Sequence, residues 1–200
     1  MYKNNDIIIS MKKLLLHCCC APCAAPALEL LVNNYDITLY FFNPNIYPQE
    51  EYHKRLEQLK KLKDIKYTDF KLIERRYDYN DFLNVSKGME NQKEGGERCF
   101  KCFKLRLFSS AETAKNNGFD LFATTLTVSP YKNSAVIFDI AKQAGDKYKI
   151  DFLYKDFKSH SAADAAPLGR EINCNRRGIE ICREAGIYRQ KYCGCEYSVR

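Results

Sequence analysis

Short apolar runs alternate along this chain with longer segments whose apolar residues recur at helical spacing. In the segment 49–63, for example, Leu56, Leu59 and Leu62 fall on one face and charged residues cover the other. Such alternation of strands and helices favours an α/β fold with a mostly parallel sheet and helices on both of its faces. The predicted strands are 12–17, 36–42, 70–74, 119–127 and 149–157, and the predicted helices are 25–34, 49–63, 79–92, 99–118, 133–145 and 175–185.

The chain is long enough for one domain with a substantial core. It has 200 residues, of which 46% are hydrophobic and 28% are charged. We expect residues 12–200 to form a single α/β metal-binding catalytic domain, preceded by an N-terminal extension over 1–11. The interval 158–174 has little regular periodicity and is predicted to be a variable surface loop.

Charge and hydropathy narrow the class of protein. The net charge of +7 favours a polyanionic partner such as nucleic acid. No run of apolar residues approaches the roughly 18 needed to span a membrane. Lys12 and Lys13 precede three leucines, but an export leader needs an apolar core of about 7–15 residues. We therefore expect a cytoplasmic protein.

Ten cysteines in a reducing compartment point to metal binding or catalysis rather than to disulfides. Most fall in three short motifs, `HCCCAPC`, `CFKC` and `CGC`. The first follows a predicted strand, where ligands of parallel sheets bind, and precedes a helix whose positive end favours thiolates. Seven are candidate metal ligands: Cys19, Cys20, Cys23, Cys99, Cys102, Cys193 and Cys195.

The other three cysteines have simpler interpretations. Cys18 is expected to follow the alternation of its strand into the core, and Cys182 fits the apolar face of the last helix. Cys174 falls in the variable loop and is interpreted as an incidental thiol. Seven ligands exceed one zinc site, which takes four, so an iron–sulfur cluster plus a second metal uses them better. Zinc remains the alternative.

Five blocks of the sequence together resemble the QueH-type (DUF208) family of cobalamin-independent epoxyqueuosine reductases. These blocks are `HCCCAPC`, `YFFNPNIYPQEEYHKR`, `RCFKCFKLRL`, `ATTLTVSPYKN` and `GIYRQKYCGC`, in family order across 13–195. The resemblance implies a Rossmann-like sheet related to the adenine-nucleotide alpha-hydrolase, or PP-loop (HUP), fold. It implies removal of the epoxide oxygen of epoxyqueuosine at the wobble position of tRNA, giving queuosine, with electrons from an unidentified donor.

The same resemblance implies cofactors and site residues. The cofactors are a [4Fe–4S] cluster and an additional iron ion, without cobalamin. The seven candidate cysteines carry over as ligands, with no division between cluster and iron. The triple cysteine makes the register of Cys18 against Cys19 worth testing, and `SHSAADAAPLGREINC` is longer than the usual family link.

Residues beside the motifs are candidates for substrate binding. Those near the ends of strands or beside the last cysteine motif are Asn43, Asn45, Ser129, Lys132, Tyr188, Arg189 and Tyr192. The cations of 54–63, Arg55 included, either contact phosphate or simply face solvent. No catalytic residue is assigned, although Tyr47, Asp139 and His17 join Tyr188 and Tyr192 as possible proton donors by proximity.

Three rival functions remain open on the residues alone. A PP-loop tRNA thiolase or ATPase would need a phosphate loop after the first strand, but `HCCCAPC` has no glycine there. An iron–sulfur thiol–disulfide reductase would act on small thiols. A zinc-stapled RNA-binding module would contain zinc and perform no redox chemistry.

Overall fold

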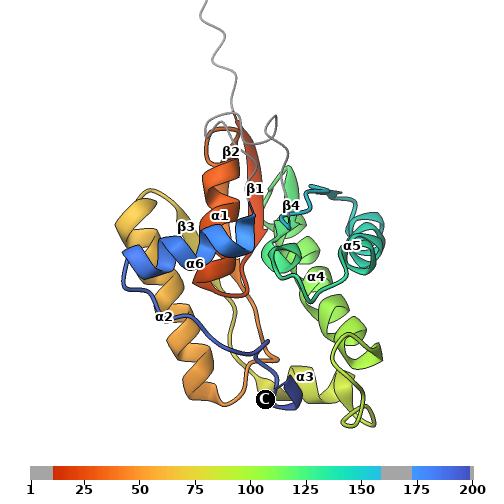
Figure 1. The fold of residues 1–200 in the computed structure, drawn as a ribbon. Helices are drawn as coiled ribbons and strands as arrows, with labels where there is room; N and C mark the ends of the chain where they lie inside the picture. Colours follow the sequence, from red (N-terminus) through yellow and green to blue (C-terminus); the bar gives the residue numbers. More distant parts are fainter. Residues whose placement is uncertain (1–10, 159–172, 199–200) are drawn as a thin grey trace, which may run out of the picture.

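A five-stranded parallel sheet forms the centre of the molecule in the computed structural model, which describes residues 11–158 and 173–198. The strands lie in the order β3-β2-β1-β4-β5 (Figure 1). Every pairing between them is parallel. Their bounds are β1 Lys12–His17, β2 Tyr35–Phe41, β3 Lys71–Glu74, β4 Leu121–Thr124 and β5 Asp151–Phe152. The predicted α/β class is confirmed, whereas the relation to the PP-loop fold stays a prediction.

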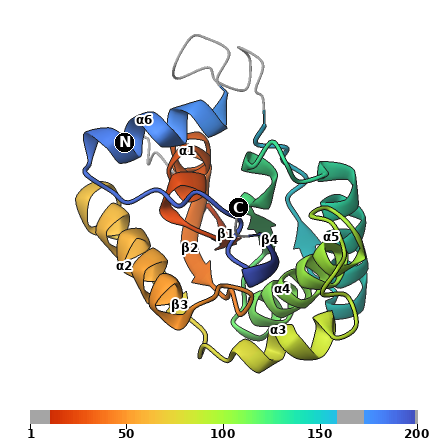
Figure 2. The ribbon, with the colours of Figure 1, turned by 60° about the horizontal axis from the view of Figure 1, so that its bottom comes forward.

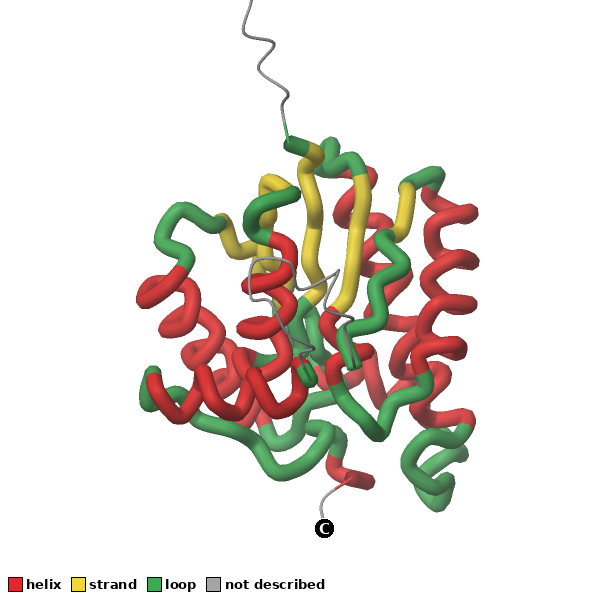
Figure 3. Tube along the Cα trace, turned by 45° about the horizontal axis from the view of Figure 1, so that its top comes forward, coloured by secondary structure: helices red, strands yellow, loops and turns green. Residues whose placement is uncertain are grey.

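Helices cover both faces of the sheet, as Figure 3 shows. One face packs against α1 (Ala21–Leu31), α2 (Gln49–Lys66) and α6 (Cys174–Glu184), and the other against α4 (Glu97–Asn116) and α5 (Ser134–Tyr148). The alternation of β1 explains this, because Leu14 and Leu16 enter the first core and Leu15 enters the second. The short α3 (Tyr79–Ser86) packs beside α4.

All the predicted strands and helices are present, but several begin or end at residues other than the predicted ones. β4 stops at Thr124, whose hydroxyl accepts from the N–H of Leu126 and opens a 3-10 helix, η1 (Thr125–Val128). α1 begins at Ala21, four residues before its predicted start. α5 continues past Gly145 to Tyr148, and Lys149 ends it in the left-handed conformation. β5 is short because the chain leaves the sheet after Leu153, whose N–H bonds Phe122 O.

The domain prediction falls partly outside the described residues. Of the predicted extension 1–11 only Met11 is described, and most of the predicted loop 158–174 is not. Cys174 contradicts its loop assignment, because it is the first residue of α6 and is fully buried. Cys18 and Cys182 are buried in the core, as predicted. Within the described ranges, none of the helices has the length and apolar character that crossing a membrane requires.

Candidate metal centre and substrate cavity

The candidate site lies at the carboxyl edge of the sheet, where the chain connections diverge. β1 pairs with β2 on one side and with β4 on the other. In parallel sheets, this switch point leaves a crevice in which ligands bind. Cys19 follows β1 and the segment 129–132 follows β4, so both border the crevice. In Figure 2, the C-terminal segment runs from α6 to this same end of β1 and β4.

The first cysteine group lies at the start of α1, where Cys20 is the N-cap and Cys23 is in the first turn. The sulfurs of Cys19, Cys20 and Cys23 all lie within 4.8 Å of one another. Pro22 suits this turn because it lacks an amide hydrogen that the helix start would leave unbonded. On the neighbouring strand connection, the hydroxyl of Thr125 accepts a bond of 3.3 Å from the N–H of Cys19. We call Cys19, Cys20 and Cys23 the α1 thiols.

The α1 thiols ionise unequally. The thiols of Cys20 and Cys23 bond the sulfur of Cys19 and hold the pKa of Cys19 well below its usual range, aided by Lys132 and Arg106. The same contact with Cys19 raises the pKa of Cys20 to about 12, and raises that of Cys23. Cys19 is therefore the thiol of this group that ionises most easily, and a bound cation would be needed to ionise Cys20 and Cys23.

The second cysteine group joins α4 to the C-terminal segment. Cys99 and Cys102 lie near the N-terminus of α4, and the N–H of Gly95 donates to Cys99 Sγ over 3.2 Å. Cys102 and Cys195 are buried together against Phe82. Burial, opposed by Arg106 and reinforced by the nearby Cys193, Cys195 and Cys99, raises the pKa of Cys102 to about 12. We call Cys99, Cys102, Cys193 and Cys195 the α4/C-terminal thiols.

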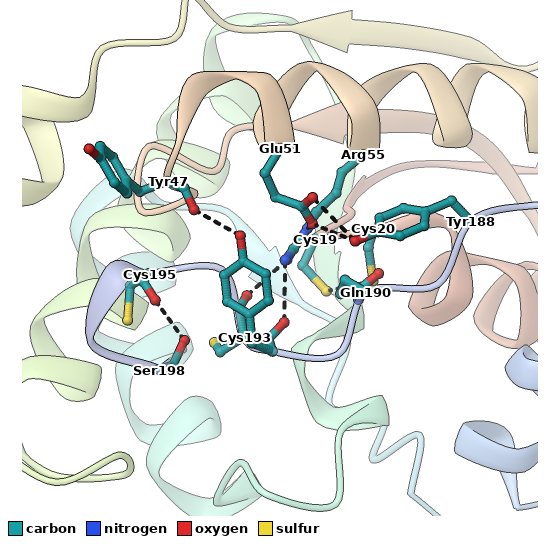
Figure 4. Close-up of polar contacts among 11 residues, drawn as sticks. Cys19, Cys20, Tyr47, Glu51, Arg55, Tyr188, Gln190, Cys193, Cys195 and Ser198 are labelled. Atoms are coloured by element: carbon teal, nitrogen blue, oxygen red, sulfur yellow. Dashed lines mark hydrogen bonds and ion pairs between the residues drawn. The ribbon is translucent and has the colours of Figure 1, made fainter. Parts of the chain in front are cut away.

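Backbone and side-chain bonds fix the `CGC` segment in place (Figure 4). Arg55 of α2 donates to the carbonyl oxygens of Cys193 and Tyr192, over 3.0 and 3.3 Å. The N–H of Tyr47 donates to Gly194 O over 2.9 Å. Gly194 has φ +128°, and a Cβ there would lie 3.0 Å from Arg55 Nη1, so the tight turn requires glycine.

One cavity of about 190 Å³ contacts thiols from both groups. Cys19, Cys23 and Cys193 form part of its wall. The remaining wall is mainly polar and cationic, with Arg55, Arg106, Ser129, Lys132, Arg189, Gln190, Lys191 and Tyr192, together with Tyr131 and Glu94. The structure thus brings cysteines of two distant motifs together at one sheet edge, whereas metal ligation by them stays a prediction.

The predicted substrate residues divide into two sets. Ser129, Lys132, Arg189 and Tyr192 line the cavity. Asn43 and Asn45 are buried, and Asn43 bonds Cys18 O through Nδ2 over 2.9 Å. Tyr188 faces α2, with Lys54 Nζ 3.6 Å from its ring centroid and its hydroxyl bonding Glu51.

Two arginines and a histidine have roles that the sequence did not indicate. Arg55, grouped with a solvated basic face, is 2% exposed and points inward to Glu51 and the `CGC` backbone. Arg106 is also buried beside the thiols. The sequence could have indicated this, because Arg106 follows Cys102 by four residues and so lies on the same face of a helix. His17 is fully buried, and its desolvation lowers its pKa to about 4. That lowered pKa leaves the ring neutral near pH 7, and its Nε2 donates to Phe42 O over 3.2 Å.

The donor set fits iron held by sulfur. The α1 thiols are already close enough to share one metal centre, and thiolate ligands are those that iron–sulfur clusters use. A thiol set does not by itself distinguish iron from zinc. The buried Arg106, with two nitrogens lacking hydrogen-bond partners, supplies positive charge beside these sulfurs. The residues present therefore suit an anionic thiolate centre.

Comparison with known proteins decides the family. A family model described as epoxyqueuosine reductase QueH matches residues 14–200. This chain belongs to the QueH family. The QueH protein of Streptococcus pyogenes is 38% identical over 191 residues, which cover 94% of this chain and 70% of that protein. The QueH proteins of Staphylococcus epidermidis and Thermotoga maritima are 36% and 33% identical, covering 76% and 91% of their own lengths.

Membership of the QueH family confirms the resemblance drawn from the five sequence blocks. The names of the relatives describe reductases, so the family places this chain among the oxidoreductases. It also favours an epoxyqueuosine reductase over the three rival functions left open by the residues. The match extends across all three cysteine motifs, because residues 14–200 include each of them.

Proposed function

We propose that this protein removes the epoxide oxygen from epoxyqueuosine at the wobble position of tRNA and so produces queuosine. Two carbon–oxygen bonds break, a carbon–carbon double bond forms, and the oxygen leaves as water after uptake of two electrons and two protons. The observation that carries the proposal is that cysteines of two distant motifs, Cys19, Cys23 and Cys193, line one cationic cavity, in a chain whose relatives are named epoxyqueuosine reductases. Cys102 of the third motif is buried together with Cys195, next to this cavity wall.

We further propose that the seven cysteines hold a [4Fe–4S] cluster and an adjacent iron ion, with no need for cobalamin. Such a cluster supplies electrons one at a time, and an iron with an open position supplies a Lewis acid. The α1 thiols provide three closely spaced ligands, and the α4/C-terminal thiols provide four more. An external donor of unidentified nature would renew the electrons.

The residues of the cavity suit a modified base on a polyanion. Lys132, Arg189 and Lys191 offer positive charge to phosphate oxygens, and Ser129 offers a hydroxyl to polar groups of the base. Tyr131 is 76% exposed beside them, and an exposed ring can stack an unpaired anticodon base. Tyr192 donates its hydroxyl to Tyr47 O, which keeps its ring beside Arg55 at the cavity wall.

The test is an anaerobic reconstitution followed by a single-turnover assay. Protein loaded with iron and sulfide is reduced with dithionite and mixed with tRNA that carries epoxyqueuosine, and digested nucleosides are then separated and weighed by mass spectrometry. We expect queuosine to form in proportion to the loaded protein, with no added cobalamin. The same preparation is analysed for iron, acid-labile sulfide and zinc.

Matched cysteine variants locate the centre. Cys99→Ala removes a proposed ligand, so iron content and queuosine formation should both fall. Cys182→Ala removes a buried thiol of the core that lies outside the seven, so iron content should be kept. Wild-type protein that binds zinc alone and forms no queuosine would overturn the proposal.

A further inference from the structure

Arg106 is a buried cation without a carboxylate partner among the described residues. Its side chain is 2% exposed, and Nη1 donates to Asn43 Oδ1 over 3.2 Å. Its Nε and Nη2 have no hydrogen-bond partner, and its other contact is with the ring of Phe103. Arg55 and Arg177, by contrast, bond Glu51 and Glu29. A buried charge without compensation is strongly unfavourable, so an anion is expected beside Arg106.

The position of Arg106 shows where that anion would lie. On α4, Cys99, Cys102 and Arg106 are three and four residues apart and share one helix face. On the opposite side, Asn43 joins Arg106 to the carbonyl oxygen of Cys18, directly before the α1 thiols. Arg106 also lines the cavity with Cys19 and Cys193. It therefore lies between the two cysteine groups.

We propose that Arg106 is the counter-cation of the thiolate-held metal centre and that its charge sets the reduction potential of that centre. The proposal rests on the proposed function, because it requires the cluster. Thiolate ligands make such a centre anionic, and each added electron makes it more so. In a buried site, a fixed positive charge stabilises the reduced form more than the oxidised form. Arg106 thus keeps the centre reducible by a physiological donor.

The neighbourhood of Arg106 supports an electrostatic role over one in holding the fold. A guanidinium used for structure bonds backbone or carboxylate oxygens, as Arg98 does with the carbonyl oxygens of Met89 and Glu90. Arg106 instead keeps two donors available beside the sulfurs. Lys132, which also lines the cavity, is a second cation near Cys19 and Cys193. Neutralising Arg106 should leave Lys132 as partial compensation.

The experiment compares Arg106→Gln and Arg106→Lys with wild type in full-length, anaerobically reconstituted protein. Iron and sulfide are counted, and the midpoint potential is measured by redox titration followed by electron spin resonance. We expect Arg106→Gln to lower the midpoint, with at least a tenfold loss in the equilibrium constant for one-electron reduction, or about 59 mV. Arg106→Lys should stay close to wild type. Arg177→Gln is the control: it removes from α6 a charge that is paired with Glu29 of α1, and it should not shift the midpoint.

The remaining outcomes of this experiment also either support or overturn the role of Arg106. Arg106→Gln with a full cluster and an unchanged midpoint would overturn the role of Arg106 while leaving the proposed function intact. If Arg106→Gln binds no cluster, retention of cluster by Arg106→Lys supports the role, because that variant restores the charge. Failure of both variants to bind cluster would overturn the role, since charge would not be the property required. Wild-type protein without a cluster would overturn this inference and the proposed metal centre together.

Discussion

Arg55 holds the C-terminal cysteine motif against the rest of the molecule. Its Nε is 2.7 Å from Glu51 Oε1 one turn earlier on α2, which orients the guanidinium. Its Nη1 then reaches the carbonyl oxygen of Cys193 (Figure 4), and its Nη2 reaches that of Tyr192. The carbonyls of a tight turn have no sheet or helix to bond, so this side chain satisfies them. Arg55 thereby positions Cys193 and Cys195 relative to the α1 thiols.

Replacing Arg55 should therefore loosen the centre. We expect Arg55→Ala to lower the free energy of unfolding by about 3 kcal/mol, because Glu51 and two backbone carbonyls lose a buried charged partner. The measurement is urea denaturation of reduced, metal-free protein, with bound iron counted on a reconstituted sample. Arg176→Ala is the control, because Arg176 is exposed and should change stability by less than about 0.5 kcal/mol. Equal effects of the two variants would contradict the positioning role.

At the scale of elements, the close packing of α6 on α1 supports the first cysteine group. Gly178 of α6 is buried and packs against the carbonyl oxygen of Pro22. A Cβ at position 178 would overlap that oxygen and would also touch Pro26. Pro22 precedes Cys23, so the contact between these helices fixes the turn that carries the α1 thiols.

Gly178→Ala should destabilise the protein, although glycine to alanine within a helix ordinarily stabilises by about 1 kcal/mol. The overlap with Pro22 forces α6 away from α1, and overpacking of this kind costs about 1–3 kcal/mol. Urea denaturation measures the free energy of unfolding of Gly178→Ala relative to wild type. The ordinary helix effect would raise this free energy, whereas the overlap with Pro22 would lower it. A more stable Gly178→Ala protein would show that α6 does not press on the α1 turn.

At the scale of the whole molecule, the candidate centre joins segments that are distant in sequence. The α1 thiols, the start of α4 and the `CGC` turn come from three different parts of the chain, and few regular hydrogen bonds attach the last of these to the sheet. A metal shared among them would act as a cross-link in the folded state. Its removal should affect the C-terminal segment most.

Hydrogen exchange can detect this effect. In reconstituted anaerobic protein treated with a chelator, amides of 188–198 should exchange faster than in the loaded protein, because local opening no longer has to break metal–sulfur bonds. Amides of β2, which pair with β1 and β3 in the centre of the sheet, serve as the internal control and should change little. Unchanged exchange over 188–198 would mean that the `CGC` motif is not tied to the metal.

Much of this protein follows from local pattern. The short apolar run in `KKLLLH` and the helical spacing in 49–63 identify β1 and α2, because such patterns decide which side chains can be buried together. The ends of elements depend on single capping contacts instead. β4 ends at Thr124 because its hydroxyl bonds the N–H of Leu126, and the resulting 3-10 turn carries the hydroxyl of Thr125 to Cys19.

The sequence by itself determined the α/β class, the family and the three cysteine motifs, since these depend on residue type and spacing along the chain. Only the tertiary structure decided that Arg55 turns inward to the `CGC` backbone and that Arg106 lies buried between the two thiol groups. It also decided that Asn43 is a buried link rather than part of the cavity wall. The surroundings of a charged or polar side chain depend on elements packed against it from elsewhere in the chain, and no local pattern records them.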